Sequence, residues 1–86
     1  MTRLLAWTDD AWVDYVYWQG QDKKTFKRIN KLIIDTKRSP FEGIGKPEPL
    51  KENLSVFWSR RVDESNRLVY AVNDSHITII SCRYHY

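Results

Sequence analysis

The sequence predicts an α+β domain of two layers, in which two N-terminal helices pack on one face of an antiparallel β-sheet in the order β-α-α-β-β-β. The chain has 86 residues, of which 42% are hydrophobic and 29% are charged, and this balance is typical of one globular domain with a small core, here spanning residues 1–86. Apolar residues recur at helical spacing before residue 39, whereas alternation with a period of two begins at residue 56. Of the three Gly and three Pro residues, five fall between residues 40 and 49 and separate these two halves.

The N-terminal half begins with a short strand, predicted at Arg3–Trp7, which leads into a first helix. Thr8 or Asp9 can cap this helix, and Gly20 is expected to end it. Its apolar stripe is expected at the spacing i, i+3, i+4, at Trp12, Tyr15 and Val16. The first helix therefore has one face suited to packing on the sheet.

A second helix is predicted after a cap at Asp22, with an apolar side formed by Phe26, Ile29 and Ile33. Residues 23–38 carry seven basic side chains against one Asp, a net charge of +6 within a chain whose total is +3. The basic residues gather opposite the apolar side, at Lys24, Lys27, Arg28, Lys31 and Arg38. Such a face is either a solvated surface or a surface that follows the phosphates of a large RNA.

The C-terminal half is predicted to form three strands, at residues 56–62, 67–72 and 76–84, which are rich in β-branched and aromatic residues. The turn-forming runs between them, residues 63–66 and 73–75, are too short for crossover helices, so the strands must form an antiparallel meander. A short extra strand is expected around Leu50–Asn53. Two helices on one face leave the other face of this sheet open to solvent.

Four arginines, Arg60, Arg61, Arg67 and Arg83, fall within the predicted strands. Because guanidinium groups cannot be buried unpaired, some of them are expected on the open face. Alternation places Arg83 and His85 on one face, and an odd loop length places Arg67 there too. Cations with nearby aromatic rings suit a single-stranded nucleic acid. The alternative is surface ion pairing with Asp63, Glu64 or Glu48.

Cleavage of RNA without a metal needs a base for the 2′-hydroxyl, cations for the charge on phosphorus, and an acid for the leaving 5′-oxygen. A carboxylate, arginines and the histidine at position 85 supply these groups. Three carboxylates lie near the central loop, at Glu42, Glu48 and Glu52, and spacing does not decide between them. Glu48 stands between two prolines that stiffen the backbone.

The composition argues against several other classes of protein. One cysteine and two histidines exclude an intramolecular disulfide and a zinc site of spaced ligands, so no metal and no cofactor are expected. Cys82 lies within an apolar run and is expected to be a buried thiol. No apolar run approaches the length that spans a bilayer, so a cytoplasmic protein without membrane contact is expected.

Four segments together carry a resemblance to a known family: residues 39–51 (SPFEGIGKPEPLK), 57–61 (FWSRR), 67–70 (RLVY) and 82–86 (CRYHY). With the Trp-rich first helix and the basic second helix, the chain resembles the YoeB toxins of the RelE superfamily. The resemblance implies a fold like that of small microbial ribonucleases, and a homodimeric bacterial type II toxin. Such a toxin binds the A site of the 70S ribosome, cuts mRNA there and is neutralised by a YefM-like antitoxin. Operator DNA is then contacted only through the antitoxin complex.

By this resemblance, Glu48 is the general base, Arg67 stabilises the transition state and His85 is the general acid. Phosphate contacts are implied for Lys51 and Arg61, and Tyr86 supports the site or stacks on mRNA. Arg83 is a further expected phosphate contact, and the basic side of the second helix is expected to contact ribosomal RNA. The internal nucleophile predicts a 2′,3′-cyclic or 3′-phosphate product. The alternative is a non-catalytic module that binds RNA, the ribosome or DNA.

Overall fold

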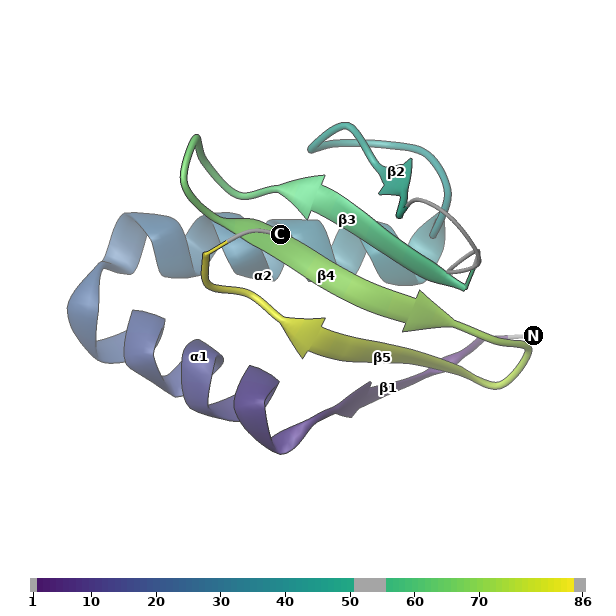
Figure 1. The fold of residues 1–86 in the computed structure, drawn as a ribbon, viewed down its shortest axis with the longest axis horizontal. Helices are drawn as coiled ribbons and strands as arrows, with labels where there is room; N and C mark the ends of the chain where they lie inside the picture. The colour runs from purple at the N-terminus through teal and green to yellow at the C-terminus, as the bar shows by residue number, and fades with distance from the viewer. Residues whose placement is uncertain (1, 51–55, 85–86) are drawn as a thin grey trace.

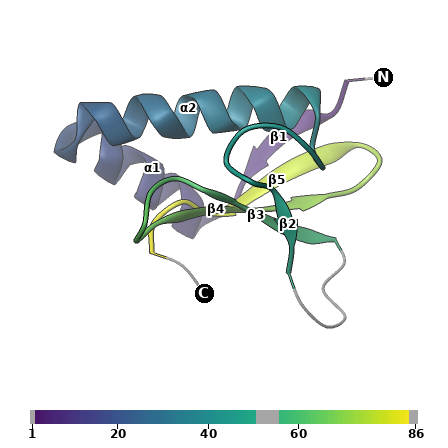
Figure 2. The same ribbon diagram turned by 90° about the horizontal axis from the view of Figure 1, so that it is seen from above.

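The computed structural model describes residues 2–50 and 56–84 as two helices packed on one five-stranded sheet (Figure 1). The elements are β1 (Leu4–Trp7), α1 (Asp9–Gln21), α2 (Lys23–Arg38), β2 (Glu48–Pro49), β3 (Phe57–Arg61), β4 (Arg67–Val72) and β5 (His76–Ser81). The strands lie in the order β1-β5-β4-β3-β2. Seen from above, both helices lie on the same side of the sheet (Figure 2). The two-layer α+β class is confirmed.

The sheet is mixed, because β1 joins it in the parallel direction. The neighbours β2–β3, β3–β4 and β4–β5 pair antiparallel, as the short connections require, whereas β1 pairs with β5 in parallel. A hairpin fixes the direction of consecutive strands. Strands β1 and β5 stand at opposite ends of the chain, so no short turn restricts how they pair, and the expectation of a fully antiparallel sheet was wrong at this edge.

Helix α1 begins at the predicted cap, where Thr8 Oγ1 accepts a hydrogen bond from Ala11 N at 3.1 Å. It does not end at Gly20 but continues to Gln21, and Asp22 follows as the residue that also caps α2. The Asp22 carboxylate accepts hydrogen bonds from two backbone N–H groups at the start of α2, so one residue fixes the corner between the helices.

The buried stripe of α1 differs from the predicted one. Trp12 and Val16 are 51% and 47% exposed, while Ala11 and Trp18 are buried and Tyr15 packs against the core. The contact face therefore follows the spacing i, i+4, i+7. A small residue at position 11 lets the helix approach the sheet closely, which turns the larger Trp12 toward the side, where it contacts Trp7 with ring centroids 5.5 Å apart.

Helix α2 has the predicted two-sided character. Ile29, Leu32 and Ile33 are buried against the sheet, and Phe26 packs at the edge of this core. The predicted basic side points away from the sheet, with Lys24, Lys27, Lys31 and Arg38 exposed and Arg28 half-buried. Neither helix of the described residues is long and apolar enough to cross a bilayer.

The predicted strands of the C-terminal half are confirmed with small changes of length. Strand β4 has the predicted bounds, but β5 ends at Ser81 because Cys82 N leaves the ladder and donates to Asp14 Oδ2 of α1 at 3.1 Å. The extra strand is β2, just before the expected position, which lies at Leu50–Asn53. Leu50 is not part of it, and residues 51–53 lie outside the described part of the chain.

Candidate functional site

The face of the sheet opposite the helices brings together three predicted site residues. Register pairs Glu48 with Ser59 and Arg61 with Arg67, while Leu68 and Tyr70 point into the core. Successive residues of a strand point to opposite faces of the sheet, and directly paired residues point to the same face. Arg67, which precedes the core residue Leu68, therefore projects from the other face. Glu48, Arg61 and Arg67 therefore share what we call the helix-free face. Glu48 is level with Val69 on β4, so Arg67 stands two strands away, about 10 Å across the sheet, and two residues, about 7 Å, further along it.

Arg67 is held at the start of β4 by its own turn. Its Nη1 donates to Asp63 O at 2.6 Å and to Asn66 O at 3.1 Å, and its backbone N–H donates to Tyr84 O at 2.8 Å. The described residues form two ion pairs, both to Asp35, so the alternative of surface pairing of Arg61, Arg67 and Arg83 with carboxylates is not found among them. The guanidinium of Arg67 is thus oriented by carbonyl groups that leave its charge unneutralised.

The C-terminal segment is anchored beside Arg67. The side-chain amide of Asn66 donates to the Asp63 carboxylate, and its Oδ1 accepts a hydrogen bond from Tyr84 N at 2.6 Å. Tyr84 adopts a left-handed conformation, with φ of 64°. The last described residue is therefore tied to the turn that holds Arg67. His85 and Tyr86, and also Lys51, lie outside the described residues.

Arg83 is placed by stacking. Because β5 ends at Ser81, strand alternation does not extend to this residue, and its guanidinium lies 3.6 Å from the ring centroid of Tyr17 and 4.7 Å from that of Tyr84. Trp18 Nε1 also donates to Cys82 O at 2.9 Å. These contacts fasten the chain after β5 to α1. Arg83 thus turns toward α1, and the structure does not bring it to Arg61 and Arg67 by strand alternation.

Arg60 does not lie on the surface but is fully buried. Its side chain is 0% exposed on the core side of β3 and donates from Nη1 to Asp35 Oδ2 at 2.7 Å. The Ile44 backbone N–H and then the Arg60 guanidinium lower the pKa of Asp35 to about 2. Burial raises the pKa of Tyr70, whose Oη accepts from Arg60 Nε at 3.1 Å. An Asp in the apolar run of α2 was the sequence signal for this pair.

Cys82 is buried, as predicted, directly after β5. Burial, with a smaller contribution from Asp14, raises the pKa of the Cys82 thiol to about 12. Because the thiolate is the reactive form of cysteine, this side chain is unsuited to nucleophilic chemistry.

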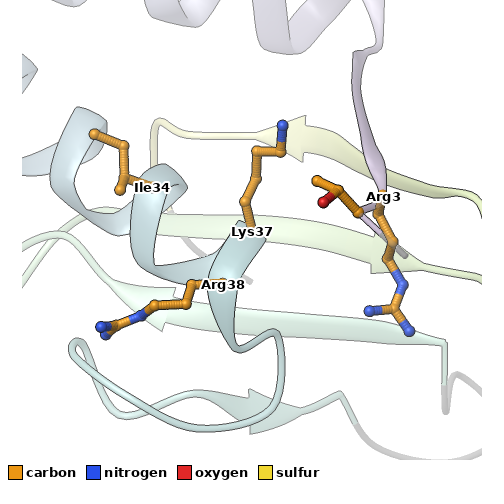
Figure 3. A pocket seen from close by; sticks show the side chains of 5 residues that line it. Arg3, Ile34, Lys37 and Arg38 are labelled. Carbon is orange, nitrogen blue, oxygen red and sulfur yellow. The ribbon is translucent and has the colours of Figure 1, made fainter.

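The helix side of the molecule carries a separate basic cavity of about 510 Å³ (Figure 3). It lies between the end of α2 and the start of the chain and is lined by Thr2, Arg3, Ile34, Lys37 and Arg38. Arg38 also pairs with Asp35, so part of its charge is already compensated. The cavity extends the basic side of α2, on the layer opposite Glu48 and Arg67.

Comparison with known proteins gives consistent results over nearly the whole chain. Residues 7–86 match the family described as "YoeB-like toxin of bacterial type II toxin-antitoxin system". Toxin YoeB of Escherichia coli K12 is 62% identical over 82 residues, which cover 95% of this chain and 98% of that protein. Toxin YoeB of Streptomyces coelicolor is 52% identical over the same shares of both chains.

Solved structures agree with this similarity. The YoeB dimer from Staphylococcus aureus matches with a TM-score of 0.90 and 47% identity, covering 100% of both chains. The YoeB-YefM complex from the same organism matches with a TM-score of 0.86 and 46% identity, again over 100% of both chains. The E. coli DinJ-YafQ complex, at 18% identity and a TM-score of 0.74 over 99% of this chain and 94% of that one, shares the fold.

Proposed function

Since the chain belongs to the YoeB-like toxin family of bacterial type II toxin–antitoxin systems, we propose that it is an endoribonuclease that depends on the ribosome. It binds the A site of the 70S ribosome and cuts the mRNA there, which stops translation. The observation that carries this proposal is the presence of Glu48, Arg61 and Arg67 together on the helix-free face.

The reaction is a transesterification within the RNA. Glu48 takes the proton of the 2′-hydroxyl, the 2′-oxygen attacks the adjacent phosphorus, and His85 gives a proton to the 5′-oxygen that leaves. The products are a 2′,3′-cyclic phosphate, which can open to a 3′-phosphate, and a free 5′-hydroxyl. Arg67 stabilises the charge that develops on the phosphorane oxygens. The hydrogen bonds from Arg67 to its own turn support this role, because they fix the direction of the guanidinium before RNA binds.

The remaining site residues bind and position RNA. Arg61, the direct cross-strand partner of Arg67, contacts an adjacent phosphate together with Lys51, and Tyr86 stacks on the mRNA or supports the site. Arg83, whose guanidinium stacks on Tyr17 and Tyr84, contacts a phosphate beside α1 and apart from Arg61 and Arg67. The basic side of α2 contacts ribosomal RNA through Lys24, Lys27, Arg28, Lys31 and Arg38.

The partners follow from the relatives. The S. aureus YoeB was solved as a dimer and in complex with YefM, and we propose a homodimer and a YefM-like antitoxin for this chain as well. Operator DNA is bound only through the antitoxin complex. The protein acts in the cytoplasm as a single domain of residues 1–86 and uses no metal or cofactor.

Primer extension on an mRNA translated with the purified protein present tests the proposal. Strong stops at codon boundaries are expected with the parent protein. Glu48→Gln and His85→Ala should each lower cleavage by roughly 10²–10⁴-fold, the range typical of a lost general base or acid. Glu48 is exposed, so its replacement leaves the core intact. Glu42→Gln is the matched control, because it removes another exposed carboxylate of the same loop.

The outcomes distinguish the alternatives. Cleavage at the parent rate in both Glu48→Gln and His85→Ala contradicts the assigned roles, and loss in Glu42→Gln instead moves the base to that residue. Translation arrest with intact mRNA supports a non-catalytic module that binds the ribosome. A 3′-hydroxyl on the upstream fragment indicates attack by water, which is a different mechanism.

A further inference from the structure

The strand that carries Glu48 has little to hold it. Strand β2 consists of Glu48 and Pro49, and both residues are exposed. Its pairing with β3 is limited to Ser59 and Trp58. One backbone hydrogen bond flanks it on each side, from Arg61 N to Gly45 O at 2.7 Å and from Leu50 N to Phe57 O at 2.9 Å. Proline has no N–H group, so Pro49 adds no donor to this ladder. The position of Glu48 therefore depends on the loop that precedes it, residues 39–47.

That loop is fastened from inside the protein by the guanidinium of Arg60. Nη2 donates to Ser39 O at 2.5 Å and to Glu42 O at 3.1 Å, and Nη1 donates to Ile44 O at 3.1 Å. Tyr70 Oη, which accepts from Arg60 Nε, donates to Pro40 O at 2.7 Å. Two side chains of the sheet thus satisfy four carbonyl groups of the loop, which lacks regular secondary structure of its own.

Asp35 completes the cluster from the side of α2. Its Oδ2 accepts from Arg60 Nη1 and from Ile44 N, the latter at 2.9 Å. Gly43 lies so close that a Cβ there, at φ of 126°, stands 2.0 Å from Asp35 Oδ2. Only glycine suits this position, since any other residue meets both the carboxylate and an unfavourable backbone conformation. The loop is consequently shaped to the Arg60–Asp35 pair.

A buried ion pair of this kind is poorly explained by stability alone. Well-packed apolar residues of similar volume are often as stable as a buried pair, or more so, because the charges must be desolvated. What apolar side chains cannot do is bind several carbonyl groups in one fixed geometry. The guanidinium fork does so here, and a lysine ammonium at the same place cannot reproduce it.

We propose that Arg60 is a positioning residue for Glu48: its buried guanidinium fixes loop 39–47 against the sheet, and so fixes the direction in which β2 presents the Glu48 carboxylate. Arg60 follows Ser59, the register partner of Glu48. Strand β3 therefore holds loop 39–47 through the Arg60 side chain and holds β2 through its pairing with Glu48. The Arg60 side chain lies on the core side, opposite the helix-free face, and acts on RNA only through Glu48. The inference rests on the proposed role of Glu48 as the base.

The test is a double-mutant comparison of cleavage rates. Single-turnover cleavage of a defined mRNA on purified 70S ribosomes is measured for Arg60→Lys in the parent and in the Glu48→Gln background. Arg60→Lys keeps the charge opposite Asp35 but loses the fork. We expect a loss of about tenfold or more in the parent, since a displacement of about 1 Å in a catalytic group can cost up to about 10²-fold. In the Glu48→Gln background the same change should alter the residual rate by no more than about twofold, because the carboxylate that it displaces is already absent.

Two further variants separate positioning from general loss of structure. Tyr70→Phe removes only the bond to Pro40 O and the acceptor for Arg60 Nε, so it folds even where Arg60→Lys does not, and it should show a smaller loss with the same dependence on Glu48. Ile77→Val trims a fully buried side chain of β5 whose register partner on β4 is Val72 and not Tyr70. It should lower the unfolding midpoint while the cleavage rate at a temperature where the protein is folded stays within twofold of the parent.

Equal losses from Arg60→Lys and Tyr70→Phe in both backgrounds, or no loss in either, overturn the positioning role and leave the proposed function standing. Failure of the parent to cut mRNA, or cleavage by Glu48→Gln at the parent rate, overturns the proposed function, and the positioning role with it. Faster hydrogen exchange at Ile44 N in Tyr70→Phe supports the proposal, because that N–H group is bonded within the same cluster.

Discussion

Asp35→Asn should destabilise the protein strongly, because it leaves the Arg60 charge buried without a carboxylate. Arg60 is 0% exposed and the Asp35 side chain is 8% exposed. Removing one partner of a buried ion pair costs about 3–5 kcal/mol. An asparagine oxygen can still accept the Ile44 N–H bond, so we expect the lower part of this range, about 3 kcal/mol. A domain of this length has a free energy of unfolding of about 4–13 kcal/mol, so the variant loses a large share of it.

The same substitution should remove part of the acid sensitivity. The pKa of Asp35 in the folded protein is about 2, below the ordinary value of about 3.9 for an unfolded chain. The carboxylate therefore stabilises the fold fully above about pH 4, and this contribution is lost as the pH falls toward 2. Asparagine does not titrate, so the free energy of unfolding of Asp35→Asn should fall less steeply across this window.

Urea unfolding followed by tryptophan fluorescence measures both effects, at one protein concentration and at several pH values between 7 and 2. Asp74→Asn is the control, since Asp74 lies exposed in the turn before β5. A loss below about 1 kcal/mol at pH 7, or an acid slope equal to that of the parent, contradicts the assignment of Asp35 as the carboxylate that compensates the buried Arg60 charge.

Three other predictions address separate parts of the molecule. Burial raises the pKa of the Cys82 thiol to about 12, so iodoacetamide at pH 8 should label it slowly in the folded protein and quickly in urea; equal rates contradict this. Asn66→Ala removes the acceptor of Tyr84 N and should cost about 1–2 kcal/mol in urea unfolding, together with a loss of cleavage; an unchanged midpoint argues against the anchor. Lys27→Gln with Lys31→Gln should weaken co-sedimentation with ribosomes and flatten its dependence on salt, whereas an unchanged salt dependence removes α2 from the interface.

Local signals in the sequence predicted most of the fold. The caps at Thr8 and Asp22 act through bonds within a few residues, and both are confirmed. The bounds of β4 could be predicted because a segment rich in apolar residues stands between two turn-forming runs, residues 63–66 and 73–75. The parallel pairing of β1 with β5 depends on two segments far apart in sequence, and no local pattern contains that information.

Local signals could not predict the choices that are made by packing between distant segments. We predicted that large apolar residues of α1, such as Trp12 and Val16, face the core. Instead Ala11 is buried there, because a small side chain lets the helix lie close to the sheet. Arg60 is directly opposite Leu68 of β4, which is a core position; a strand arginine can occupy such a position only if a carboxylate meets it there, and Asp35 comes from a helix 25 residues earlier. Spacing could not choose Glu48 over Glu42 or Glu52, and the structure adds that Glu48 is paired with Ser59 of β3.

The arrangement of the two layers gives a physical reason for the proposed dependence on the ribosome. Glu48, Arg61 and Arg67 project from the helix-free face, where the described residues provide cations and a carboxylate in one layer. An oriented in-line attack needs the scissile phosphate held from more than one side, and solvent weakens each charge that it reaches. A protein that offers one wall of a site reaches full activity when a second surface brings the RNA to it and excludes water. In the proposed function the ribosomal A site is that surface, and the basic side of α2, on the opposite layer, is the part proposed to hold the protein in place there.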